Sequence, residues 1–145
     1  MYAARVGASR EPAGAADVMS GEQEMGEGSR AKVLVVEDEY LIRMLLEDML
    51  SELDYELAAA VGSLAEASEL AAHGDFNVAI LDVNLDGVEI YPVADILAQR
   101  GLPFVFVSGY GEGSLAEPYR GRPALQKPFQ AEQLKAMLAG LLAPA

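Results

Sequence analysis

The sequence predicts an α/β fold, a doubly wound parallel sheet of five strands with helices on both faces, on the strength of two observations. Short apolar runs of strand length alternate with longer stretches in which apolar residues recur at helical spacing. Each predicted strand also lies too far along the chain from the next one for a hairpin, so the strands pair in parallel through right-handed crossovers. The 145 residues are enough for one domain with its own core.

The first thirty residues are predicted to form a mostly disordered tail, and the folded domain to span residues 31–143. Residues 1–30 are rich in Gly, Ala, Ser and Glu and have no sustained apolar period. A short helix over 13–19 and a translation start at Met19 or Met25 are alternatives that the sequence leaves open.

Two strand–helix units are predicted in the first half of the domain. Ser63 and Glu66 have the spacing of a capping box, which marks the start of the second helix. The predicted elements are a strand at 32–36, an amphipathic helix over about 41–53, a weaker strand at 55–61 and a helix at 64–72.

The second half of the domain is predicted to add three strands and two helices. Six Gly and Pro residues between Gly109 and Pro123 argue against a stable helix there, although 114–119 could form a turn or two. Asp86-Gly87 is expected to be a turn. The predicted elements are strands at 77–82, 103–107 and 124–126, a helix over about 91–99, and a last helix at 129–142.

Composition excludes several functions. The net charge of −13 argues against nucleic-acid binding, which needs clustered Lys and Arg. The absence of Cys excludes disulfides and cysteine nucleophiles, and the single His73 weakens any Ser-His-Asp hydrolase hypothesis. No apolar run approaches the ~20 residues of a membrane span, and no signal peptide is apparent, so we expect a cytoplasmic protein.

Charged and hydroxyl side chains stand at the carboxyl ends of four predicted strands. Glu37 and Asp38 follow the first strand, Asp82 ends the third, Ser108 follows the fourth, and Lys127 follows the fifth. The carboxyl ends of parallel strands share one edge of the sheet, where open α/β sheets bind their ligands. Each residue alone is ordinary for a surface or a cap, but together they predict a site.

These residue types suit phosphoryl transfer with Mg²⁺. Packed carboxylates repel each other and Mg²⁺ prefers oxygen ligands, so the carboxylates and the backbone carbonyl of Asn84 would suit the metal. The Asp82 carboxylate can attack a phosphoryl group to give an acyl phosphate. Lys127 would contribute a mobile positive charge to the phosphoryl oxygens, and Ser108 a hydrogen bond.

Four motifs, in this order and at these separations, resemble the receiver domain of bacterial two-component response regulators. They are V-L-V-V-E-D-E, I-L-D, V-S-G and K-P-F, and the resemblance covers about residues 31–142. It implies the (βα)5 flavodoxin-like fold. The implied roles are Asp82 as phosphoacceptor, Glu37 and Asp38 as the acidic pair of the Mg²⁺ site, Ser108 as the hydroxyl that senses the phosphoryl group, and Lys127 before its proline, joined through a cis peptide bond.

The stretch P-F-V-F-V-S-G-Y-G, residues 103–111, is similar to the FAT GUY subgroup of receivers. Phe106, Gly109 and Tyr110 fit its signature, while Val107 and Ser108 replace the usual Ala and Thr. The resemblance implies a stand-alone response regulator served by a histidine kinase of the HWE or HisKA2 type. Such a protein acts through partners, as a phosphate sink, a relay to a phosphotransferase, or a kinase regulator, and not as an enzyme on other substrates.

Two residues depart from the family pattern. The acidic pair is Glu-Asp, so we expect Asp38 to bind the metal directly and Glu37 to act through water. Ala124 stands where the family usually has its switch aromatic, so we expect Ser108 and Tyr110, with a mobile segment over 109–121, to report phosphorylation by an order–disorder change.

Three other functions are alternatives to the receiver. A phosphatase of the haloacid-dehalogenase type also uses a nucleophilic Asp after a strand, but it would usually need a second acid where Asn84 stands, and a cap domain. A nucleotide-binding module is weakly indicated, because Gly109-x-Gly111-x-Gly113 has the wrong spacing. A pseudo-receiver that binds partners without phosphorylation remains the third alternative.

Overall fold

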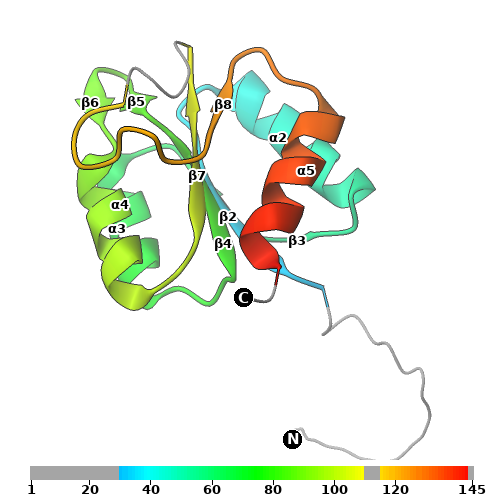
Figure 1. The fold of residues 1–145 in the computed structure, drawn as a ribbon, viewed down its shortest axis with the longest axis horizontal. Helices are drawn as coiled ribbons and strands as arrows, with labels where there is room; N and C mark the ends of the chain where they lie inside the picture. Colours follow the sequence, from blue (N-terminus) through cyan, green and yellow to red (C-terminus); the bar gives the residue numbers. More distant parts are fainter. Residues whose placement is uncertain (1–29, 110–114, 144–145) are drawn as a thin grey trace, which may run out of the picture. The chain divides into compact units, whose positions relative to one another are not determined.

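The core of the fold is a five-stranded parallel sheet in the order β3-β2-β4-β7-β8 (Figure 1). The computed structural model describes residues 30–109 and 115–143, so the predictions for the tail and for Tyr110 lie outside the described residues. The strands are β2 (Lys32–Val36), β3 (Glu56–Val61), β4 (Val78–Asp82), β7 (Phe104–Ser108) and β8 (Ala124–Gln126). The predicted parallel sheet is confirmed.

Helices cover both faces of the sheet, as Figure 1 shows, with α3 and α4 on one side and α2 and α5 on the other. Alternate residues of β4 pack on opposite faces: Leu81 lies in the α3–α4 layer and Ile80 in the α2–α5 layer. Burial on both faces explains why β2, β4 and β7 read as unbroken apolar runs. The helices are α2 (Tyr40–Glu52), α3 (Leu64–His73), α4 (Tyr91–Arg100) and α5 (Ala131–Leu142). None of these helices is long and apolar enough to cross a membrane.

The connection from β7 to β8 contains no helix in its described part, as the Gly and Pro content predicts. Leu115 and Tyr119 in this connection are nevertheless buried, with 1% and 5% of their surface exposed. The prediction of a mobile segment over 109–121 follows the Gly and Pro content and does not consider the burial of these two side chains. From Leu115 onward the connection packs against the α3–α4 layer.

A small hairpin between β4 and α4 was not predicted, although its turn was. β5 (Asn84–Leu85) and β6 (Val88–Glu89) pair in antiparallel fashion. The turn residues Asp86 and Gly87 have φ angles of 52° and 89°, the left-handed region that Asp-Gly turns favour. Strands of two residues carry no alternation from which a sequence pattern could be recognised.

The starts of α3 and α5 are both fixed by N-terminal capping residues. The amide of Glu66 donates to Ser63 Oγ over 3.2 Å, which confirms the predicted N-cap of α3. The last helix was expected to begin at Phe129, but it begins at Ala131. The reason is a capping box at Gln130, whose amide donates to Gln133 Oε1 over 2.7 Å.

Candidate functional site

The carboxyl ends of the strands bring the predicted site residues to one edge of the sheet. Glu37 and Asp38 follow β2 directly, Asp82 ends β4, Ser108 ends β7, and Lys127 directly follows β8. The peptide bond between Lys127 and Pro128 is cis, as the family resemblance implies.

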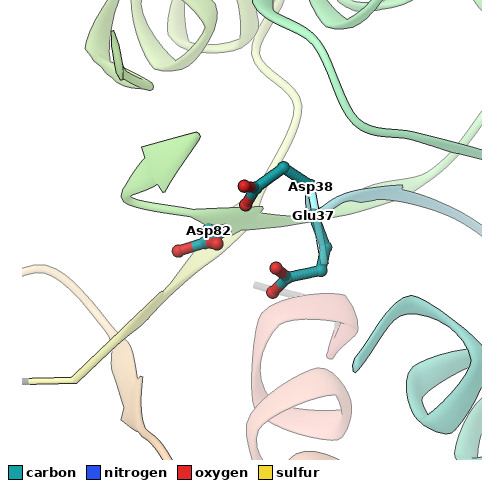
Figure 2. Close-up of side chains that lie close together, drawn as sticks. All are labelled: Glu37, Asp38 and Asp82. Carbon is teal, nitrogen blue, oxygen red and sulfur yellow. The ribbon is translucent and has the colours of Figure 1, made fainter. Parts of the chain in front are cut away.

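Three carboxylates gather at the centre of this edge (Figure 2). Glu37, Asp38 and Asp82 each offer one oxygen, and these oxygens all lie within 4.8 Å of one another. Glu37 and Asp82 are buried, whereas Asp38 is half-buried. Carboxylates held together away from water repel each other, so the cluster requires a counter-charge.

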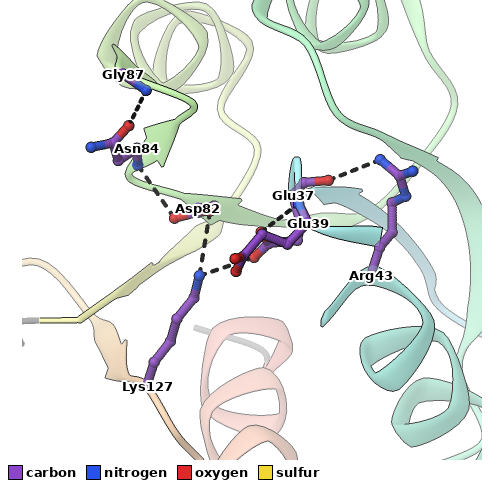
Figure 3. A network of polar contacts seen from close by, with 7 residues as sticks. All are labelled: Glu37, Glu39, Arg43, Asp82, Asn84, Gly87 and Lys127. Carbon is purple, nitrogen blue, oxygen red and sulfur yellow. Dashed lines mark hydrogen bonds and ion pairs between the residues drawn. The ribbon is translucent and has the colours of Figure 1, made fainter. Parts of the chain in front are cut away.

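The side chain of Lys127 supplies part of that counter-charge (Figure 3). Its Nζ lies 3.2 Å from Glu37 Oε1 and 3.4 Å from Asp82 Oδ2. Burial lowers the pKa of Lys127, but the charges of Asp82 and Glu37 oppose this, and the pKa is raised overall. Lys127 therefore stays protonated and faces both carboxylates.

Burial is the main cause of an unusual pKa at Glu37. It raises the pKa of this carboxyl from 4.5 to about 7, although the amide of Glu39, which donates to Glu37 Oε2 over 3.0 Å, opposes the rise. The nearby charge of Asp82 adds to it. The pKa of Asp82 is raised as well, first by burial, against the favourable contacts with Glu37, Lys127 and the Asn84 amide.

The donor set fits a hard divalent cation. Glu37 Oε1 is buried, and among the described residues it faces Lys127 in ion-pair geometry without receiving a hydrogen bond. Three carboxylates, one of which has an oxygen that accepts no hydrogen bond, suit a cation that prefers oxygen ligands, such as Mg²⁺. The acidic cluster can therefore hold a metal; whether Asp38 or Glu37 would bind it directly stays a prediction.

A cavity of about 230 Å³ opens beside Asp82. The amide of Asn84 donates to Asp82 Oδ1 over 3.3 Å, and the Asn84 side chain accepts from the Gly87 amide over 2.6 Å, which fixes the start of the hairpin. Ser108 is buried in the same cavity wall. The residues that line the cavity are Asp82, Val83, Asn84, Glu89, Tyr91, Ser108 and Gly109.

Two of these wall residues, Glu89 and Tyr91, were missed from the sequence. The sequence predicts Tyr91 only as the first residue of a helix over about 91–99, and it assigns Glu89 to no element. The signal that could have found them is the Asp86-Gly87 pair, because a two-residue hairpin turn returns the chain to its starting point, beside Asp82.

The arrangement brings a cluster of three carboxylates that could hold a cation, an ammonium and a buried hydroxyl to one edge of the sheet, with a cavity beside Asp82 and Ser108. The chain matches the family model described as the response regulator receiver domain over residues 33–139. The transcriptional regulatory protein PdtaR of Mycobacterium tuberculosis is 36% identical over 109 residues, which are 71% of this chain and 52% of PdtaR. The chain thus spans about half the length of this curated relative.

Solved receiver structures agree with the fold. SdrG from Sphingomonas melonis Fr1 is 42% identical, with a TM-score of 0.70, over 82% of this chain and 100% of that chain. The BeF3-activated conformation of SdrG from Pseudomonas melonis Fr1 is 44% identical over 79% of this chain and 99% of that chain, with a TM-score of 0.68.

Proposed function

The chain belongs to the response regulator receiver domain family, and we propose that it accepts a phosphoryl group from a histidine kinase on Asp82, with Mg²⁺ as cofactor. The observation that carries the proposal is the position of the Asp82 carboxylate. It ends the central strand β4, lies 3.4 Å from the Lys127 ammonium, and opens onto a cavity. Phosphoryl transfer needs this combination of a positioned nucleophile and positive charge.

In the proposed reaction an Asp82 oxygen attacks the phosphorus of a phosphohistidine. The new P–O bond forms as the P–N bond breaks, and the imidazole leaves with the electron pair and takes up a proton from water. Lys127 neutralises charge on the phosphoryl oxygens, and the hydroxyl of Ser108 and the amide of Asn84 donate hydrogen bonds to them.

Glu37, Asp38 and Asp82 would hold Mg²⁺, with the backbone carbonyl of Asn84 as a further ligand. When bound, the metal would supply positive charge beside the phosphoryl oxygens. The raised pKa of Glu37 fits this role, because a buried carboxyl that costs free energy to ionise gains most from a cation.

The signal would pass to a protein partner and not to DNA, since the net charge of the chain is −13. The FAT GUY resemblance favours a cytoplasmic regulator served by an HWE or HisKA2 kinase. The existence of a BeF3-activated conformation of SdrG supports phosphoryl-dependent signalling in a similar chain. A phosphate sink, a relay to a phosphotransferase and a kinase regulator all fit such a protein.

The first turns of α2 are suited to receive the kinase. Tyr40, Leu41 and Leu45 expose 64%, 79% and 48% of their surface, which is unusual for large apolar residues so close together. Leu45 also lines an apolar groove of about 300 Å³ with Pro128 and Phe129, and this groove extends to Lys127 at the acidic cluster. A helix docked here could present its histidine to Asp82.

Incubation with acetyl phosphate and Mg²⁺, followed by intact mass measurement, tests the proposal. We expect one phosphoryl group on the wild type and none on Asp82→Asn. Turnover of phosphate esters would instead favour the phosphatase of the haloacid-dehalogenase type, and an unmodified wild type would favour the pseudo-receiver.

A further inference from the structure

The wall of the Asp82 cavity includes Tyr91, the first residue of α4. Its hydroxyl accepts a hydrogen bond of 2.9 Å from the amide of Ala116, which belongs to the connection between β7 and β8. One side chain therefore touches both the cavity that would take the phosphoryl group and the segment that follows Ser108.

The segment Leu115–Tyr119, here called the docked turn, is held on α4 by further contacts. The ring of Tyr119 stacks on that of Tyr91, with centroids 5.8 Å apart and an interplanar angle of 6°. The Tyr119 hydroxyl donates to Asp95 Oδ1 over 2.5 Å. Asp95 lies four residues after Tyr91, so both anchors face the turn from the same side of α4. Figure 1 shows this connection, in orange, passing beside α4 before it enters β8.

Protonation of Tyr119 is secure, because burial and the neighbouring Asp95 raise its pKa to about 12. The hydrogen bond from Tyr119 to Asp95 is therefore not lost through deprotonation of the tyrosine at neutral pH. Of the two tyrosines that make these hydroxyl contacts, Tyr91 is the one that lines the cavity.

Phe106 links this aromatic group to the sheet. It makes edge contacts with Tyr91 and Tyr119, at centroid distances of 5.9 and 5.5 Å, and it lies two residues before Ser108 on β7. Its neighbour across the sheet is Ala124, whose methyl group cannot act as a switch aromatic. Among the residues that the structure describes, Tyr91 on α4 and Tyr119 in the docked turn are thus the aromatic side chains that pack on Phe106 from outside the sheet.

We infer that Tyr91 couples phosphorylation of Asp82 to release of the docked turn from α4. The inference rests on the proposed function. A phosphoryl group adds about −1.5 to −2 charges and three strong acceptor oxygens to a cavity that has Tyr91 in its wall. The Tyr91 hydroxyl turns toward these oxygens as a donor, its bond to the Ala116 amide breaks, and buried Leu115 becomes available to a partner.

The test is hydrogen exchange of the Ala116 amide, measured by NMR with and without Mg²⁺ and beryllofluoride as the phosphoryl mimic. The Val83 and Asn84 amides, next to Asp82, report saturation of the site. In the wild type we expect Ala116 exchange to rise about tenfold or more at saturation, as for loss of one hydrogen bond. In Tyr91→Phe exchange is already fast without the mimic and rises less than about twofold.

Tyr119→Phe is the matched control, since it removes the other hydroxyl of the stacked pair and leaves the hydrogen bond between Tyr91 and the Ala116 amide. In this variant we expect Ala116 exchange to rise at saturation as it does in the wild type. If the exchange rate of the Ala116 amide stays unchanged in wild type whose site is saturated, this inference is overturned and the proposed function still stands, whatever the variants do. A wild-type response in a folded Tyr91→Phe would do the same. If Val83 and Asn84 never respond in the wild type, the proposed function fails, and this inference fails with it.

Discussion

The carboxylates of Glu37 and Asp82 lie side by side, with one oxygen of each within 4.8 Å of the other, although both side chains are buried. In the metal-free protein this closeness costs free energy whenever both groups are ionised. The same closeness is what a shared cation would use.

The stability of the metal-free protein should depend on pH through Glu37. Its pKa is about 7 in the folded protein against an ordinary 4.5, so between these values the folded state binds more protons than the unfolded state. The contribution of Glu37 to stability is therefore lost as pH rises from about 4.5 to about 7 and stays constant above. Asp82, whose pKa is also raised, acts in the same direction.

Thermal unfolding in EDTA, compared between wild type and Glu37→Gln, measures this effect, because the variant cannot ionise at this position. We expect the wild type to lose midpoint temperature relative to the variant as pH rises from 5 to 8. A wild type that gains on the variant over this range would show that Glu37 is not buried as described.

Removal of Mg²⁺ should stop phosphorylation by acetyl phosphate. Without the cation, the charge of the carboxylates repels the incoming phosphoryl oxygens. We expect EDTA to abolish the mass increase and added Mg²⁺ to restore it, with Asp38→Asn needing about tenfold more Mg²⁺ if Asp38 is a ligand. Equal labelling in EDTA would rule out a metal requirement.

Loss of the Lys127 ammonium should slow the reaction directly. It is the cation that contacts both Glu37 and Asp82 among the residues the structure describes. We expect Lys127→Met to lower the initial rate of labelling by acetyl phosphate at least about tenfold, since it removes one charge that stabilises the transferring group. Lys135→Met, on the exposed side of α5, is the control and should label at the wild-type rate.

Leu41, the most exposed leucine of α2, should matter for transfer from a kinase but not for transfer from a small phosphoryl donor. Leu41→Ala removes an apolar side chain that is 79% exposed. Transfer from whichever histidine kinase phosphorylates the wild type should fall about tenfold, as expected for one buried leucine at an interface. Labelling by acetyl phosphate should be unchanged, and Leu57→Ala, on β3, should affect neither donor. Equal loss with both donors would mean that the variant disturbs the site.

Much of this fold was accessible from sequence because its signals are local and agree with each other. The strand at Asp82 is an unbroken apolar run, and each strand end carries a polar group, so topology alone brings Asp82, Lys127 and Ser108 to one edge. Ser63 was correctly identified as a cap because its partner Glu66 is three residues away.

What the sequence did not indicate depends on contacts between distant segments. The sequence predicts that Glu37, the longer acid of the pair, acts on the metal through water. It does not indicate that the Glu37 carboxylate is buried, because burial depends on the packing around β2, which no local pattern reveals. Tyr119 lay in a stretch judged by its Gly and Pro content, yet its stacking on Tyr91 depends on a contact 28 residues away along the chain. The start of α5 was missed because Gln is an uncommon N-cap.

The most direct measurement identifies the residue that carries the phosphoryl group. After labelling with acetyl phosphate and Mg²⁺, borohydride reduces an aspartyl phosphate to homoserine, and trypsin separates the candidates: Glu37 and Asp38 fall in residues 33–43, and Asp82 in residues 44–100. We predict homoserine in place of Asp82 in the wild type and none in Asp82→Asn. A modified residue in 33–43, or undiminished labelling of Asp82→Asn, would contradict the assignment of Asp82 as the phosphoacceptor.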